Sequence, residues 1–366
     1  MTDFGIRAVG LSFASISIIF LLSMPSFAAA YSSSNDSITQ QWVNQEVSSW
    51  KPSTIYHMGF GAVLTTASYG NVPGNSIQVV TSDLNMLAST GIGSVRIDIN
   101  YAPWLQLDQK TINEISSAIQ GARNIGLKII IADAASETYR SSGGISWSQF
   151  QRLWIQRVRT IASLYNPDYY IVIKEPGWYV PMVSDSNSNP LFRSPSSWIN
   201  LTQNLADAVL GVSPNTKVGV SVAADSVGTN PSLYVPYLRG IESLGVVSFV
   251  GFDIYTKSGF TTTRNFLTKI GSGGKSIWIA EAWSAASSTA GDPSRANLDS
   301  SWIQMLYYFG ESQIHVSMII PFYTNNLAQY STSSLIQDPS FFISREPVYC
   351  AYQSIISSNK ALTIPR

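Results

Sequence analysis

The sequence predicts a single (β/α)8 barrel. Eight short apolar runs recur from Tyr56 onward, and amphipathic stretches of about 12–18 residues separate them. No linker or internal repeat beyond this alternation divides the chain. Alternating strands and helices are typical of βα units around a parallel sheet. A chain of 366 residues is long enough for one closed barrel of this kind.

The apolar runs are the predicted strands. They are rich in Val and Ile and lack strict alternation with polar residues, which suits strands buried on both faces. Their ranges are 58–63, 94–99, 127–132, 169–173, 217–222, 247–254, 276–280 and 316–322.

The intervening stretches predict helices. Apolar residues keep a period of about 3.6 residues in 109–125 and in 146–165. Gly126 stands at the stop position of the first of these helices. Asp292 followed by Pro293 provides an N-cap and a first-turn proline, and this pair predicts the start of the seventh helix.

A doubly wound open sheet is the alternative fold for such a pattern. It would usually carry a glycine-rich phosphate loop after the first strand. Gly59 and Gly61 begin such a loop, but the third glycine is missing. The chain also lacks a P-loop and a G-x-S-x-G string.

Composition excludes several classes of partner and cofactor. The 22 basic residues balance 22 acidic ones, and no basic run with interleaved aromatics occurs, so we expect no nucleic-acid partner. The single cysteine, Cys350, cannot form an internal disulfide, and a thiolate zinc site is excluded. His57 and His315 flank predicted strands and are interpreted as structural. We expect neither a metal nor an organic cofactor.

The first 30 residues indicate export. Arg7 supplies a positive charge, residues 8–22 are apolar, and residues 28–30 offer a small-residue cleavage site. If it were not cut, this signal peptide would be a signal anchor just able to span a bilayer. We expect a secreted or extracellular protein whose membrane contact is limited to such an anchor. Residues 31–55 form a polar lead-in, and residues 56–366 form the barrel.

Two glutamates directly follow buried runs: Glu175 at the fourth strand and Glu281 at the seventh. Barrel enzymes carry their chemistry at these strand ends, and a carboxylate there is costly unless it is paired or functional. Strands four and seven lie on opposite sides of a closed barrel, so inward-pointing side chains converge over its mouth. Two carboxylates that flank a bond suit glycoside hydrolysis. Alternatively, both are surface carboxylates at helix N-termini.

The strand ends resemble those of the retaining (β/α)8 glycoside hydrolases, which include cellulases, mannanases, β-galactosidases and endo-galactanases. Lys174-Glu175-Pro176 resembles the Asn-Glu-Pro string of the acid/base strand, and the Trp-Ile-Ala-Glu string ending at Glu281 resembles the nucleophile strand. The resemblance covers roughly residue 56 to the C-terminus. It implies that Glu281 is the nucleophile and Glu175 the acid/base.

Two more strand ends carry the resemblance. Asp253-Ile254-Tyr255 resembles the end of strand six, whose Tyr bonds the nucleophile, and Arg96 resembles the arginine that supports it. Alternatively, Arg96 is a structural partner of a carboxylate such as Asp98, and Tyr255 is satisfied by a neighbour. Asp98 is also a candidate for substrate binding.

Lys174 departs from the family pattern, in which an asparagine amide bonds the sugar 2-hydroxyl. A cation beside Glu175 favours its ionised form and would lower its pKa, which opposes a general acid at neutral pH. This departure motivates two rival functions. One is a non-catalytic carbohydrate-binding barrel at the cell surface. The other is a lyase or aldolase that uses Lys174 as a Schiff-base amine.

Other polar and aromatic residues also follow the predicted strand ends. For Asp133 and Asp253, the sequence allows either a structural or a functional role. Sugar rings stack on aromatic side chains, although core packing is their commoner use. We expect substrate contacts first from Trp283, two residues beyond Glu281, and then from the other aromatics of this set, which are Tyr101, Trp104, Trp178, Tyr179 and Tyr323.

The predicted function is retaining hydrolysis of β-glycosidic bonds in an extracellular poly- or oligosaccharide. Glu281 attacks the anomeric carbon, and Glu175 protonates the leaving oxygen and then activates water. Arg96 and Tyr255 hold Glu281, and Lys174 lies close to the substrate. Retaining enzymes need the two carboxyl groups about 5–5.5 Å apart, and we predict that separation here.

Overall fold

The computed structural model describes residues 33–50, 58–64, 77–99, 109–133, 146–176, 194–270, 274–282, 296–311, 316–320, 328–329, 343–344 and 346–361. The predicted signal segment, both histidines and the Asp292-Pro293 pair lie outside these ranges. In the described part of the chain, no helix has the length and apolar character needed to cross a membrane.

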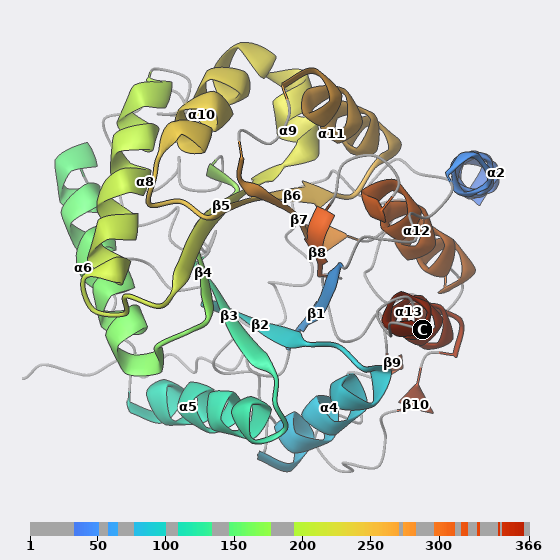
Figure 1. Cartoon of the computed structure of the whole chain (residues 1–366), viewed down its shortest axis with the longest axis horizontal. Coiled ribbons are helices and arrows are strands. Elements are labelled where there is room, and N and C mark those ends of the chain that lie inside the picture. The colour runs from blue at the N-terminus through green and yellow to red at the C-terminus, as the bar shows by residue number, and fades with distance from the viewer. Residues whose placement is uncertain are drawn as a thin grey trace, which may run out of the picture.

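Eight parallel strands close into a barrel in which sequence neighbours pair and β8 returns to β1. Figure 1 looks into this barrel and shows the helices as a ring around it. This confirms the predicted (β/α)8 barrel. The strands are β1 (Gly59–Val63), β2 (Ser94–Ile99), β3 (Lys128–Asp133), β4 (Tyr169–Lys174), β5 (Lys217–Ala223), β6 (Phe249–Ile254), β7 (Ser276–Ala282) and β8 (Val316–Ile319).

Each predicted strand overlaps an observed one, and β2 has the predicted bounds. The largest difference is at β8, which ends at Ile319 rather than at residue 322. A short antiparallel pair, β9 (Ala328–Gln329) with β10 (Ile343–Ser344), was not expected from the sequence.

Helices cover the barrel, and both periodic stretches form them as predicted. Gly126 follows α5 (Gln109–Asn124) in the left-handed region at φ 83°, where glycine has no Cβ penalty. Ser146 caps α6 (Trp147–Tyr165) by accepting the Gln149 N–H at 3.3 Å. The outer helices are α4 (Ile77–Thr90), α5 (Gln109–Asn124), α6 (Trp147–Tyr165), α8 (Pro195–Leu210), α9 (Ala224–Thr229), α10 (Pro231–Ser243), α11 (Lys257–Ile270), α12 (Ala296–Phe309) and α13 (Glu346–Ala361).

The polar lead-in contains a further helix, α2 (Ser33–Ser49), which lies outside the ring beside α12 (Figure 1). The Trp42 ring lies 5.5 Å from the Phe260 ring and 5.9 Å from the Trp302 ring. Glu46 forms an ion pair with Arg264 at 3.5 Å. The lead-in therefore adds a packed element to the barrel wall.

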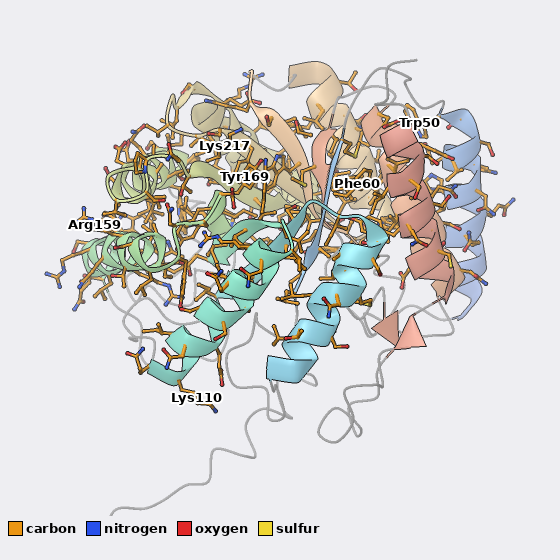
Figure 2. The ribbon with its side chains drawn as sticks, turned by 60° about the horizontal axis from the view of Figure 1, so that its bottom comes forward. Trp50, Phe60, Lys110, Arg159, Tyr169 and Lys217 are labelled. Carbon is orange, nitrogen blue, oxygen red and sulfur yellow. The ribbon has the colours of Figure 1, made fainter. Side chains whose placement is uncertain are left out.

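An apolar plug fills the lower part of the barrel. The rings of Phe249 and Trp278 stack at 3.7 Å, and Tyr169 lies 5.0 Å from Trp278. Lys217 Nζ lies 5.9 Å from the centroid of the Tyr169 ring. The two residues begin neighbouring strands, and Figure 2 labels both of them. This plug closes the barrel beneath the polar residues of the strand ends, as in other barrels whose interior is packed in layers.

Candidate active site

The strands that carry the two candidate glutamates each contain a bulge just before them. On β4, Ile171 pairs with Gly219 and Ile173 with Val220, so Val172 has no partner in register. On β7, Ile279 pairs with Phe252 and Glu281 with Asp253, so Ala280 is left over. A bulge adds one residue and turns the following side chains toward the other face of the strand.

The carbonyl of each bulged residue is taken by a side-chain donor. The Trp154 indole donates to the Val172 carbonyl at 3.1 Å, and Arg96 Nη1 donates to the Ala280 carbonyl at 2.6 Å. These bonds satisfy backbone groups that the bulge removes from the sheet. The side chains of Lys174 and Glu281 point into the barrel, where they meet Arg96 and Asp98 of β2.

Arg96 connects β2 with β7 inside the barrel. Its Nε donates to Asp98 Oδ1 at 2.6 Å and its Nη2 to Asp98 Oδ2 at 2.8 Å. Nη2 also donates to Glu281 Oε1. Arg96 and Asp98 are fully buried, and Glu281 is 1% exposed. Both sequence interpretations of Arg96 therefore hold geometrically, since it is a partner of Asp98 and also contacts Glu281.

Lys174 contributes a second cation to the same carboxylates. Its Nζ donates to Asp98 Oδ2 at 2.9 Å and forms an ion pair with Glu281 Oε1. An ammonium between two carboxylates is stabilised in its charged form. The sequence predicts an effect of this charge on Glu175, and the structure adds two ion pairs, with Asp98 and with Glu281.

The pKa of Asp98 reflects these contacts. Burial on its own would raise it, but the charges of Arg96 and Lys174 act in the opposite direction and lower the pKa of Asp98 to about 2. Asp98 is therefore ionised over the whole physiological pH range, and it holds both cations in place under Glu281.

Tyr255 binds the other oxygen of Glu281, because its hydroxyl donates to Oε2. Burial, followed by the nearby charges of Glu175 and Glu281, raises the pKa of Tyr255 well above its usual value. The phenol thus stays protonated and remains a donor. Both oxygens of Glu281 are held in fixed directions, Oε1 by the cations and Oε2 by the phenol.

Glu175 lies at the end of β4 with a backbone conformation that is rare for a residue with a side chain. Its φ is 50°, and its N–H donates to the Ser221 carbonyl at 2.9 Å. Left-handed backbone outside glycine costs about 1–3 kcal/mol and concentrates at functional sites. Glu175 is only 9% exposed. The charge of Glu175 raises the pKa of both Tyr255 and Asp253, and so does the charge of Glu281. The two glutamates therefore lie near the same two side chains.

Asp133 and Asp253, for which the sequence allowed either a structural or a functional role, lie in different places. Asp133 turns away from the mouth, where Arg157 Nε donates to its two oxygens at 2.9 and 3.1 Å and the Tyr170 hydroxyl donates at 3.0 Å. It joins β3 to the helix layer, so it is a structural partner. Asp253 lies inside the barrel, where the Ser221 hydroxyl donates to its Oδ2 at 3.0 Å.

Two residues near the candidate glutamates were not predicted. Ser221 occupies an inward position of β5, and the alternation of that strand (Val218, Val220 and Val222 outward) could have identified it. Tyr234 on α10 bonds Ser226. Burial raises the pKa of Tyr234 to about 12, and the charge of Glu175 acts in the same direction. No local pattern places a helix residue at the mouth.

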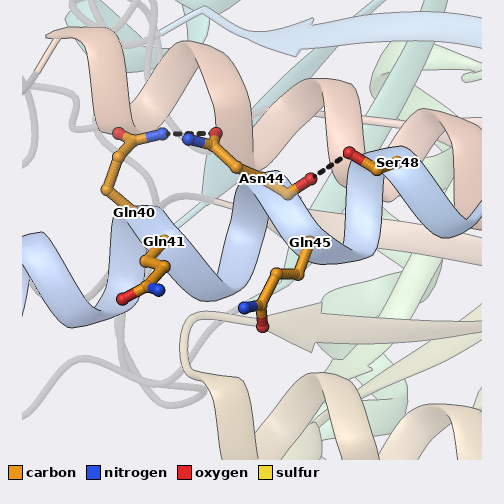
Figure 3. Close-up of a pocket in the computed structure, with 5 residues that line it drawn as sticks. All are labelled: Gln40, Gln41, Asn44, Gln45 and Ser48. Carbon is orange, nitrogen blue, oxygen red and sulfur yellow. Dashed lines mark hydrogen bonds between the residues drawn. The ribbon is translucent and has the colours of Figure 1, made fainter.

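The aromatic candidates Tyr101, Trp104, Trp178, Tyr179, Trp283 and Tyr323 lie outside the described residues and stay predictions. The described surface has a shallow hollow on α2, away from the charged cluster (Figure 3). It is lined by polar side chains of a single helix, Gln40, Gln41, Asn44, Gln45 and Ser48. We assign the candidate site to the strand ends because the buried charges converge there.

Comparison with known proteins gives a likeness in fold. No family model matches the chain, and no curated protein matches it in sequence. The apo structure of β-glucosidase 1317 is similar, with a TM-score of 0.56 and 10% identity, over 89% of this chain and 94% of that one. A β-glucosidase from Thermotoga maritima in complex with methoxycarbonyl-substituted glucoimidazole has a TM-score of 0.59 and 10% identity, over 84% and 99%.

An exo-β-1,4-mannosidase, Op5Man5 from Opitutaceae bacterium strain TAV5, is also similar, with a TM-score of 0.57 and 10% identity. The match covers 85% of this chain and 63% of that one. At this level of identity, these likenesses establish that the chain shares the (β/α)8 fold of the three enzymes.

Proposed function

We propose that the protein is a retaining glycoside hydrolase that cleaves β-glycosidic bonds of a poly- or oligosaccharide outside the cell. One observation carries the proposal: Glu281 is buried and held at both oxygens, by Arg96 and Lys174 on one side and by Tyr255 on the other. A carboxylate fixed in this way is suited to attack a single carbon. The likeness in fold to β-glucosidases and a β-mannosidase supports the assignment.

In the proposed first step, an oxygen of Glu281 bonds the anomeric carbon while the bond to the leaving oxygen breaks. Glu175 donates its proton to that oxygen. In the second step, Glu175 takes a proton from water, whose oxygen replaces Glu281 at the anomeric carbon. Two inversions leave the anomeric configuration unchanged. We predict a carboxyl separation of about 5–5.5 Å for these two groups.

The contacts of Glu281 match what each step needs. Arg96 and Lys174 lie at Oε1 of Glu281, where they can offset the negative charge that develops when the carboxylate leaves the sugar. Tyr255 donates to Oε2 and so fixes the orientation of the carboxylate plane of Glu281. Lys174 is held as an ammonium between Asp98 and Glu281. This geometry disfavours the Schiff-base alternative, because that chemistry needs a neutral amine.

A non-catalytic sugar-binding barrel is the second candidate. The same observation motivates it, since two cations on one carboxylate also stabilise the charge that must be given up in attack. In that case the protein would bind glycans without cleaving them.

Reducing-sugar release from a panel of β-linked polysaccharides, from acidic to neutral pH, separates these candidates. Wild type and Glu281→Gln are compared, with Glu311→Gln as the matched control. Glu311 is a fully buried carboxyl at the end of α12, outside the cluster. We expect release by wild type and Glu311→Gln and none by Glu281→Gln. Glycan binding without release by any variant would favour the binding barrel, and full activity of Glu281→Gln would reject Glu281 as nucleophile.

A further inference from the structure

A third carboxyl lies inside the barrel next to Glu281. Asp253 on β6 is the register partner of Glu281 on β7, and it is fully buried. Its Oδ2 accepts the Ser221 hydroxyl at 3.0 Å. Its Oδ1 has no hydrogen-bond partner among the residues that the structure describes. The mechanism proposed above assigns no role to this group.

The charges that act on Asp253 come from β2, from β4 and its C-terminal end, and from β7. Arg96 on β2 and Lys174 on β4 are the cations, and Glu175 on β4 and Glu281 on β7 are the anions. Within the described part of the chain, the ion pairs of Arg96 and Lys174 are made to Asp98 and Glu281.

The charge balance of the cluster is already complete without Asp253. The two cations already form ion pairs with Asp98 and Glu281, and Glu175 acts on Asp253 as a further anion, so an ionised Asp253 would be an additional buried negative charge beside Glu281. Such a charge is costly without its own partner. Burial, followed by the charges of Glu281 and Glu175, raises the pKa of Asp253 well above its usual value, and the opposing effects of Lys174 and Arg96 are smaller.

We propose that Asp253 is a positioning residue that keeps a proton while Glu281 is ionised, and that loss of this proton limits the site at alkaline pH. The proposal rests on the proposed role of Glu281. A neutral Asp253 leaves Arg96 and Lys174 committed to Glu281. When Asp253 releases its proton to solvent, its new charge competes for the same two cations, and Glu281 loses its fixed position.

The hydrogen bonds fit this protonation state. An ionised carboxylate accepts at both oxygens, whereas a protonated one donates at one oxygen and accepts at the other. Ser221 donates to Oδ2, which leaves Oδ1 for the proton. Asparagine reproduces the shape of the neutral carboxyl and cannot ionise, so Asp253→Asn is the diagnostic variant.

Thermal unfolding as a function of pH tests the proton on Asp253 without any assay of activity. A raised native pKa means that the native state binds more protons than the unfolded state above pH ~4, so this residue lowers stability as pH rises. The Tm of Asp253→Asn minus that of wild type should therefore increase from pH ~4 upward. Asp98→Asn is the control, because the lowered pKa of Asp98 confines its own pH dependence to below pH ~4, and its Tm difference from wild type should stay constant above that pH. A Tm difference for Asp253→Asn that does not change with pH would overturn the proposal.

The pH profile of hydrolysis tests the link to Glu281. Each enzyme is normalised to its own maximum, so that a general loss of activity does not affect the comparison. We expect the alkaline midpoint of Asp253→Asn to lie about one pH unit or more above that of wild type. Coincident alkaline limbs would overturn the link to Glu281. If no variant hydrolyses any glycan, the proposed function fails, while the Tm comparison still decides whether Asp253 is protonated.

Discussion

Glu281 is held by three side chains from three strands, and each contact has a different physical character. Arg96 on β2 offers a planar guanidinium, Lys174 on β4 an ammonium, and Tyr255 after β6 a neutral hydroxyl. The cations form ion pairs with Glu281, whereas the hydroxyl only orients it. Substitutions of the two kinds should therefore have different effects on stability and on turnover.

Tyr255→Phe removes the donor to Glu281 Oε2 and leaves both cations in place. We expect kcat to fall about 10–100-fold, because a hydrogen bond to a charged group contributes roughly 1.5–3 kcal/mol. Tyr352→Phe is the matched control, since its hydroxyl donates to the Gly61 carbonyl at 2.6 Å outside the cluster. Steady-state kinetics should show a loss for Tyr255→Phe alone, and equal kcat values for the two variants would contradict the assigned role.

Lys174→Asn restores the residue typical of the family, yet we expect it to weaken the protein. Asp98 and Glu281 would lose one of the two cations that they share, and removing one partner of a buried ion pair costs about 3–5 kcal/mol. Urea unfolding at neutral pH measures this loss, and activity should fall with it. Lys174→Arg keeps the charge and serves as the control. A Lys174→Asn variant as stable and more active than wild type would show that Lys174 is not part of the support of Glu281.

The strands show which parts of the fold were readable from sequence. Runs of Val and Ile located all eight, because each strand is buried on both faces. The bulges at Val172 and Ala280 were not readable, because they depend on which carbonyls Trp154 and Arg96 can reach. The two aspartates, in contrast, follow the alternation of their strands. Asp133 faces the helices with Ile129 and Ile131, whereas Asp253 faces inward with Phe249.

Helix α2 was missed because most of its residues are polar. Among its described side chains, Trp42, Val43 and Val47 pack against the barrel wall, and Lys257 lies 5.2 Å from the centroid of the Trp42 ring. Such a helix gains its stability from packing, so composition alone does not reveal it.

Trp42→Ala tests whether α2 is part of the folded domain. The ring is half-buried against Phe260 and Trp302, so we expect a loss of about 2–3 kcal/mol in the free energy of unfolding. Gln45→Ala lies on the exposed face of the same helix and should change stability by less than ~0.5 kcal/mol. Urea unfolding compares the two, and equal midpoints would mean that α2 does not contribute to the stability of the barrel.

The whole barrel is a closed ring of strands with opposite charges at its centre. Its stability should therefore decrease both at acidic and at alkaline pH. Asp98 must be ionised to hold Arg96 and Lys174, whereas an ionised Asp253 would compete for them. The cluster should be most stable between the pH at which Asp98 becomes protonated and the pH at which Asp253 becomes ionised.

The acid side of this range gives the last prediction. The pKa of Asp98 is lowered to about 2 in the native state, and that of an unfolded aspartate is about 3.9. The unfolded state therefore takes up protons first as pH falls, so the stability that Asp98 contributes is present above pH ~4 and is lost toward pH ~2. The size of the loss is on the order of 2 kcal/mol. Urea unfolding between pH ~2 and ~6 should show this decline in wild type and a shallower one in Asp98→Asn. Parallel curves would mean that Asp98 is not the carboxylate that ties the two cations to the barrel.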